Sequence, residues 1–131
     1  ERAAPVPGLS FRRAGSAELV EQGARFDVVI SNHLLHHLDD RGLDGLIADS
    51  EALAARLSAH SDIARSRSAY LAFSAGSVPL AAGSFIRIDG LRSIRRSYTP
   101  EELSSRLPPG WRVERPGAFR LLAVRRSPGP S

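Results

Sequence analysis

The stretch FDVVISNHLLHHLDD, residues 26–40, decides the fold class of this 131-residue chain. Its contiguous β-branched run VVI is typical of a parallel strand that is covered on both faces. The run ends on the polar pair Ser31-Asn32, and three histidines follow within five positions. Open α/β sheets bind ligands beyond the carboxyl ends of their strands. A metal site, a catalytic base and the rim of a ligand pocket are therefore all open interpretations of this stretch.

The segments around this stretch alternate between helical and extended patterns. Ser16 would cap a short helix that Gly23 ends, and Asp39 or Asp40 would cap a long helix with one apolar stripe. The predicted helices are 16–22, 41–58, 64–75 and one that begins after Thr99. The predicted strands are 9–13, 26–31, 85–88 (before a turn at Asp89-Gly90), and 111–115 with 119–126 as a hairpin. Residues 57–63 fit either a weak strand or a helix end.

The clearest helix start in the sequence is Thr99-Pro100-Glu101-Glu102. Thr99 can cap the helix, Pro100 fits its first turn, and Glu102 completes a capping box. Alternation of strands and helices of this kind implies a parallel sheet with helices on both faces, to which the hairpin would add an antiparallel edge. The sequence therefore predicts the α/β class.

Composition excludes several kinds of protein. The chain has no cysteine, which rules out disulfides, thiolate metal sites and a cysteine nucleophile. No apolar run approaches the roughly 20 residues that cross a bilayer, so no membrane contact is expected and a cytoplasmic location fits. The net charge is +4, and all 18 basic residues are arginine. Because phosphate-binding surfaces usually mix arginine with lysine, the bias is interpreted as coding background, and nucleic acid is the least favoured partner.

Several segments resemble the class I S-adenosylmethionine-dependent methyltransferases. AGSAELVEQGARFDVV followed by ISNHLLHHLDD is similar to the segment that contains the family's fourth strand and the loop and helix start after it. SYTPEEL and PPGWRVERPGAFRLLAVRR resemble the closing helix and antiparallel strands of many small-molecule members. SDIARSRSAY and SFIRIDGLRSIRRSYTPEEL resemble the substrate-side insertion of one bacterial branch. The resemblance covers most of the chain from about Leu9 onward.

The resemblance implies a Rossmann-like, mostly parallel α/β sheet that lacks the family's first strands. The glycine-rich loop and the acidic residue that ends the second strand are missing, and no G-x-G pattern occurs. The expected organisation is a linker at 1–8, a methyltransferase-like domain at 9–126 with a helical substrate-side insertion at about 64–98, and a disordered tail at 127–131. We expect that the true chain continues before Glu1 or that this is a fragment, which alone would bind cofactor poorly.

The same resemblance implies S-adenosyl-L-methionine as the cofactor and indicates which residues contact it. Ser31, Asn32 and His33 would line its methionine end, and the alternative is a plain polar loop. Ser16 and Ala17 fall at the family's adenine-contacting loop, where the Ser16 hydroxyl can accept a hydrogen bond from the adenine amine. The alternative for Ser16 is a helix cap.

The three histidines have the spacing i, i+3, i+4, so a helical turn would place them on one face. That spacing can hold zinc, but no acidic partner or fourth ligand is evident, and no metal is expected. His36 or His37 can act as a general base that deprotonates the acceptor. In the alternative interpretation, His37 braces the loop through a backbone hydrogen bond while His36 faces solvent or substrate.

Two groups in the insertion would shape an acceptor site. The first group is a set of arginines: Arg87, Arg92, Arg95 and Arg96. They can bind a carboxylate or phosphate of a substrate, contact nucleic-acid phosphates, or form a solvated surface. The bulky apolar residues can form a lid over a small-molecule pocket or part of the core; they are Tyr70, Phe73, Phe85 and Ile86.

The expected function is methyl transfer from S-adenosyl-L-methionine to a small molecule at oxygen or carbon, by direct in-line displacement. The alternatives are a non-catalytic fragment or pseudoenzyme that acts through association and, third, a nucleic-acid methyltransferase with salt-dependent binding. The expected partner is a small-molecule acceptor, and a homodimer stays open.

Overall fold

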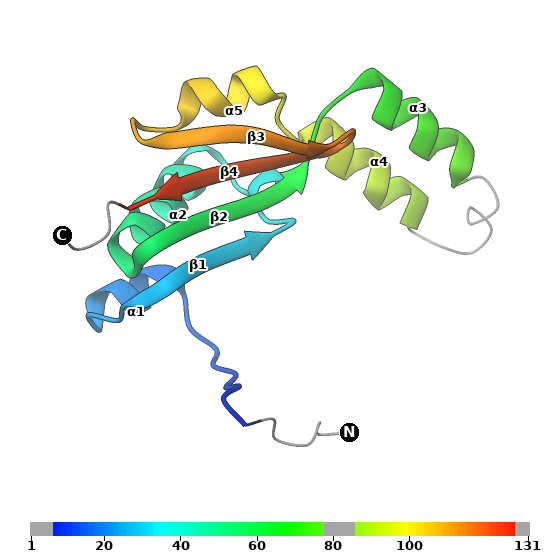
Figure 1. Ribbon diagram of the computed structural model, residues 1–131. Helices are drawn as coiled ribbons and strands as arrows, with labels where there is room; N and C mark the ends of the chain where they lie inside the picture. Colours follow the sequence, from blue (N-terminus) through cyan, green and yellow to red (C-terminus); the bar gives the residue numbers. More distant parts are fainter. Residues whose placement is uncertain (1–6, 78–85, 128–131) are drawn as a thin grey trace.

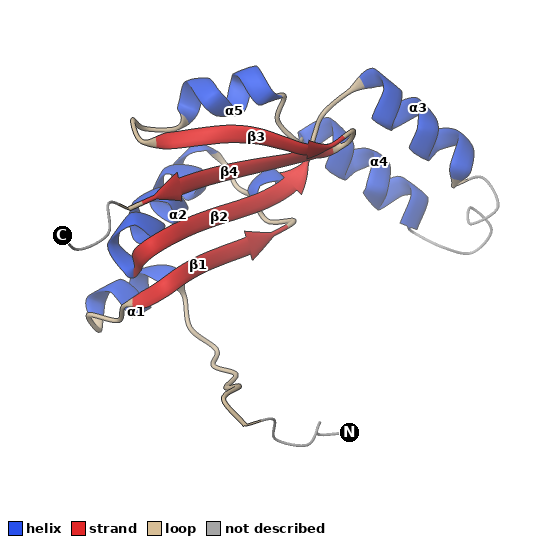
Figure 2. Cartoon of the chain, viewed as in Figure 1, coloured by secondary structure: helices blue, strands red, loops and turns tan. Residues whose placement is uncertain are grey.

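The computed structural model describes residues 7–77 and 86–127 and contains one four-stranded sheet (Figures 1 and 2). The strand order is β1-β2-β4-β3, with β1 parallel to β2 and β4 antiparallel to both of its neighbours. The strands are β1 Phe26–Asn32, β2 Ala54–Ile63, β3 Trp111–Gly117 and β4 Arg120–Arg126. The helices are α1 Ser16–Glu21, the 3-10 helix η1 Leu35–His37, α2 Asp40–Leu53, α3 Arg67–Gly76, α4 Ile86–Arg96 and α5 Pro100–Arg106.

This arrangement confirms the predicted α/β class with an antiparallel C-terminal hairpin. The described sheet is mixed and not mostly parallel, because β1–β2, joined through α2, is its one parallel pair. The linker predicted at 1–8, Phe85 and the tail predicted at 127–131 fall wholly or largely outside the described residues. The strand predicted at 9–13 is not formed; those residues belong to no helix or strand.

The boundary between α2 and β2 differs from the prediction. Asp39 caps α2, because its Oδ1 accepts a hydrogen bond from the backbone N of Gly42 at 2.8 Å. The helix ends at Leu53 instead of 58, and Leu57 lies in β2, paired with Val28 of β1. After Leu53 the extended conformation is favoured over the helical one, because β2 forms backbone hydrogen bonds with both β1 and β4.

The segment predicted as a strand and a turn is instead helix α4. Asp89 lies in the first turn of this helix, where its charge complements the helix dipole. Gly90 serves close packing: a Cβ atom added there would overlap the ring of Phe73 on α3. The glycine therefore allows two helices to approach each other, and it does not form the turn that its pairing with Asp89 suggested.

The capping box of α5 is confirmed, and the predicted cap of α1 is wrong. Thr99 N donates to Glu102 Oε2 at 2.9 Å, and Glu102 N donates to Thr99 Oγ1 at 3.2 Å. The N-cap of α1 is Gly15, while the hydroxyl of Ser16 donates to Asp49 Oδ2 at 2.6 Å. Gly23, with φ of 67°, follows the end of α1 as predicted.

The core lies between one face of the sheet and the helices α2 and α5. In Figure 1, α2 lies behind the sheet, and no described helix crosses the face toward the viewer. Large and small apolar side chains of the sheet pack against leucines and an isoleucine of the helices. The buried cluster consists of Leu35, Leu43, Ile47, Ala64, Leu103, Trp111, Leu121 and Ala123.

Strand β1 is not covered on both faces as its sequence predicted. Phe26, Val28 and Ile30 are 44%, 48% and 75% exposed, and alternate residues of a strand share one face of the sheet. β1 is also an edge strand, because its only neighbour in the described sheet is β2. An apolar face and an unpaired backbone edge are therefore both open at the strand that the sequence marks as the most buried.

Candidate functional site

The carboxyl ends of β1 and β2 lie side by side and point toward α3 and α4 (Figure 1). Parallel pairing places Ser31 opposite His60 and Asn32 opposite Ser61. The polar residues that end two separate strands are thereby gathered at one edge of the sheet. This is the position at which open α/β sheets bind ligands.

The tip of β1 is fixed by side chains of its neighbours. Ser31 Oγ and His60 Nδ1 are hydrogen-bonded at 2.8 Å. Asn32 Oδ1 and Ser61 Oγ each accept a hydrogen bond from Arg120 Nη1, both at 3.3 Å. Arg120 thus joins the start of β4 to the ends of both parallel strands.

His33 adopts an uncommon backbone conformation directly after β1. Its φ is 54°, and its backbone N donates to the carbonyl of Ser61 at 2.9 Å. A non-glycine residue in this left-handed region stores local strain, and such residues cluster at functional sites. The side chain of His33 is exposed and lines a cavity.

His36 forms a buried pair with Asp62 at the end of β2. His36 Nδ1 lies 2.7 Å from Asp62 Oδ1, and His36 N donates to Asp62 Oδ2 at 2.9 Å. Both side chains are 3% exposed. An ionised carboxylate only accepts hydrogen bonds, so it assigns the imidazole proton to Nδ1 and leaves Nε2 with a free lone pair. This is the arrangement of an oriented general base.

The structure departs in part from the interpretation in which His37 braces the loop and His36 faces solvent or substrate. The side chain of His36 is buried and itself anchors the loop to Asp62. His37 has an exposed ring and contributes a main-chain hydrogen bond from its N to the carbonyl of Leu34 at 3.0 Å. The rings of His33 and His37 flank that of His36, with centroid separations of 6.4 Å and 4.0 Å.

His60 is fully buried behind the tip of β1. Its ring stacks on Trp111 at a centroid distance of 5.4 Å, and its Nε2 has no hydrogen-bond partner among the described residues. Burial disfavours the charged imidazolium and lowers the pKa of His60 to about 4. His60 is therefore neutral at neutral pH. The hydrogen bond between its Nδ1 and Ser31 Oγ positions the Ser31 side chain.

A cavity of about 530 Å³ opens beside these strand ends. Its walls come from the ends of β1 and β2, the turn of the hairpin, and the helices α3 and α4. The main lining residues are His33, Ile63, Phe73, Ile94, Phe119 and Arg120. Phe73 lines this cavity, whereas Tyr70 lines a different one. The volume is in the range of small-molecule sites.

Ser16 and Ala17 lie apart from this cluster. Figure 1 places α1 beside the first half of β1, away from the strand's tip. Ser16 donates its proton to Asp49 of α2, which leaves lone pairs of the hydroxyl able to accept a hydrogen bond. The structure therefore brings Ser31, Asn32, His33, His36 and His37 together, and it does not bring Ser16 and Ala17 to them.

Sequence reasoning missed Asp62, His60 and Arg120. The first two lie in the segment that fitted either a strand or a helix end, and no acidic partner for the histidines was evident along the chain. The available signal was the period-two spacing of His60 and Asp62. In a strand, this spacing puts both side chains on the same buried face as Ser58. Arg120 is brought close only by the hairpin, 88 positions from Asn32.

Within 7–77 and 86–127, no group of three or more histidine and acidic side chains is placed to hold a metal ion. Among the helices described, none is both long and apolar enough to cross a membrane.

Comparison with protein-family models gives no match, and comparison with curated protein sequences gives none either. Among solved structures, the chain is similar to magnesium protoporphyrin IX methyltransferase from Synechocystis PCC 6803, solved with bound SAH (S-adenosylhomocysteine). The identity is 21% and the TM-score 0.42, and the match covers 82% of this chain and 48% of that one. The chain thus spans about half the length of that enzyme. The likeness is a partial one in fold, and function is inferred from the chain's own residues.

Proposed function

We propose that this chain carries the acceptor side and part of the cofactor side of an S-adenosyl-L-methionine-dependent methyltransferase that acts on a small molecule at oxygen or carbon. The observation that carries the proposal is the buried His36–Asp62 pair at the carboxyl ends of two parallel strands, beside a cavity of about 530 Å³. The resemblance of residues 14–40 to the family's fourth-strand region supports the choice of cofactor.

The residues at the tip of β1 suit one end of this cofactor. Asn32 and His33 are exposed next to the cavity, and their amide and main-chain groups can bind the polar methionine end. The sequence contains no G-x-G loop, so these residues would bind one end of the cofactor and not surround it. When bound, the cofactor supplies an electrophilic methyl group on a sulfonium.

We propose His36 as the final proton acceptor, reached from the cavity through His33, which lines the cavity wall and would relay the proton because His36 itself is buried. Asp62 holds the His36 ring and stabilises the imidazolium that forms when Nε2 takes the proton. A positioned base of this kind contributes roughly 10²- to 10⁴-fold to a rate. His37 is the alternative base, because its exposed ring lies 4.0 Å from that of His36.

A titration followed by NMR tests cofactor binding by the chain. Adding S-adenosylhomocysteine to the ¹⁵N-labelled chain should shift the backbone amide signals of Asn32 and His33, and those of Ser16 and Ala17 if the adenine end reaches α1. The substitution Asn32→Ala should weaken the response, whereas Ser104→Ala on the exposed side of α5 should not. Shifts that spare residues 31–33 at millimolar ligand would refute the assignment.

One observation favours the second candidate, a non-catalytic module that acts through association. The exposed apolar residues Phe26, Val28 and Ile30 lie on an unpaired edge strand, and such an edge is a template for pairing with another strand. This candidate predicts that S-adenosylhomocysteine leaves all amide signals unchanged, while Ile30→Lys lowers the self-association measured by analytical ultracentrifugation.

A further inference from the structure

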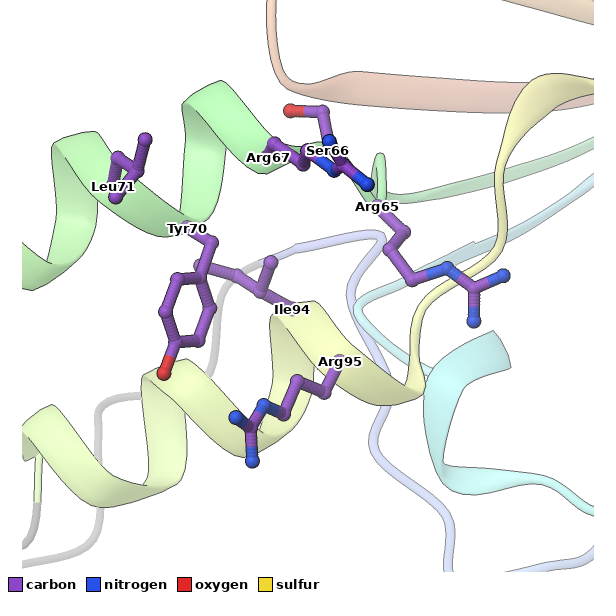
Figure 3. A pocket seen from close by; sticks show the side chains of 7 residues that line it. All are labelled: Arg65, Ser66, Arg67, Tyr70, Leu71, Ile94 and Arg95. Carbon is purple, nitrogen blue, oxygen red and sulfur yellow. The ribbon is translucent and has the colours of Figure 1, made fainter.

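A second cavity, of about 390 Å³, lies at α3 and α4; it shares Ile94 with the cavity at the strand ends, and its other lining residues are different (Figure 3). Figure 3 shows Tyr70 extending from α3 to α4 next to Arg95, with Ile94 behind it and Leu71 further along α3. These side chains give the cavity an apolar and aromatic wall. Leu71 is 66% exposed, so a ligand that covers it would remove apolar surface from water.

Cations surround this apolar wall. Arg65, Arg67 and Arg95 all line the cavity. Arg65 is paired with Glu102 of α5, and Figure 3 shows it directed away from Tyr70. Arg67 and Arg95 are exposed, and no carboxylate of the described residues forms an ion pair with either. The guanidinium of Arg95 lies 5.3 Å from the centre of the Tyr70 ring, which holds the cation over the apolar wall.

The charge of the whole chain is concentrated around this cavity. Segment 64–98 contains six arginines and one acidic residue, so its net charge is +5. The remaining residues contain 12 arginines and 13 acidic residues, which gives −1. The local excess arises because segment 64–98 has one acidic residue against 13 elsewhere. Its arginines are therefore largely uncompensated by carboxylates of the same segment, which favours the binding of anions.

We propose that the α3–α4 cavity binds a small amphipathic carboxylate, with its aromatic or aliphatic body on Tyr70, Leu71 and Ile94 and its carboxylate on Arg67 and Arg95. The planar guanidinium fork matches a carboxylate in geometry and charge. The apolar wall favours such a ligand over inorganic phosphate or a nucleic-acid backbone, which have no apolar body to place there. The proposal does not depend on methyl transfer.

Isothermal titration calorimetry with 1-naphthoate tests the site on the whole chain. Arg95→Gln and Arg67→Gln should each raise the Kd by about tenfold, as expected for loss of one charge-assisted contact. Arg92→Gln is the matched control, because it removes the same charge from an exposed position of the same helix, and it should change the Kd less than twofold. The neutral analogue 1-naphthalenemethanol lacks both charge-assisted contacts, so it should bind more weakly than naphthoate binds the Arg95→Gln variant.

Two outcomes would overturn the proposal. If Arg92→Gln weakens binding as much as Arg95→Gln, the anion is attracted by the overall charge of α4 and not by this cavity. If 1-naphthalenemethanol binds as tightly as 1-naphthoate, the arginines do not select a carboxylate. No cofactor is present in these titrations, so their result is independent of whether the chain binds S-adenosylhomocysteine.

Discussion

The buried ring of His60 predicts a specific dependence of stability on pH. Burial lowers the pKa of His60 from 6.5 to about 4 in the folded chain, while the unfolded chain keeps the ordinary value. Between these two pKa values the unfolded state binds more protons than the folded state. The stabilising contribution is therefore fully present above about pH 6.5 and is lost as the pH falls toward 4.

The size of the effect follows from the two pKa values. Protonation of the unfolded chain alone lowers the free energy of unfolding by about 2 kcal/mol between pH 7 and pH 5, and by roughly 3 kcal/mol when the pH reaches 4. Acidic residues also titrate in the lower part of this range, so the effect of His60 must be measured as a difference between two proteins. The variant His60→Gln removes the titrating ring and keeps a side chain that can hydrogen-bond to Ser31.

Urea unfolding at pH 7 and pH 5 provides the assay, with fluorescence of Trp111 as the signal. Trp111 is the one tryptophan of the chain and is 8% exposed, so its emission reports loss of the core. The wild-type chain should lose about 2 kcal/mol more than His60→Gln on going from pH 7 to pH 5. His37→Gln, at an exposed ring, should behave as wild type. Parallel losses in the wild type and His60→Gln would show that burial does not keep this ring neutral.

Two further substitutions test contacts of the fold. Asp62→Asn should lower the free energy of unfolding by roughly 2–4 kcal/mol in the same urea assay, because a buried carboxylate that accepts from the ring and backbone of His36 is lost. Gly90→Ala should lower it by roughly 1–2 kcal/mol despite the better helix propensity of alanine, since the new methyl group would overlap the ring of Phe73.

Matched controls separate these effects from general ones. Asp44→Asn makes the same chemical change at an exposed position of α2 and should alter stability by less than about 0.5 kcal/mol. Gly45→Ala adds a methyl group where no atom lies within 4 Å, so it should stabilise α2 by up to about 1 kcal/mol. An equal loss in Asp44→Asn and Asp62→Asn, or a stabilised Gly90→Ala variant, would contradict the contacts described.

The elements that were predicted correctly carry their signals locally. The β-branched run of β1 and the capping box at Thr99 each depend on a few adjacent residues. The α/β class followed from these signals together with the apolar stripe of α2. The exposure of β1 could not be predicted from its own residues, because it depends on which strands are present beside it.

The elements that were missed depend on distant partners. The buried face of β2 consists of small and polar side chains, so it lacks the apolar alternation that marks a strand. The partner of His36 is Asp62, 26 positions away, and the pairing of β1 with β2 sets that contact. The sequence predicted a histidine cluster at the right place, but the roles of its members were set by an acid on another strand.

The strand order has a consequence for biosynthesis. Of the four described strands, β4 comes last in the sequence, yet it lies between β2 and β3. While the chain grows on a ribosome, β2 and β3 are complete before the strand that joins them exists. The second edge of the β1–β2 pair therefore has no strand partner until Arg120–Arg126 has left the ribosome and can pair with β2. Deleting this one segment would separate β3 from the β1–β2 pair.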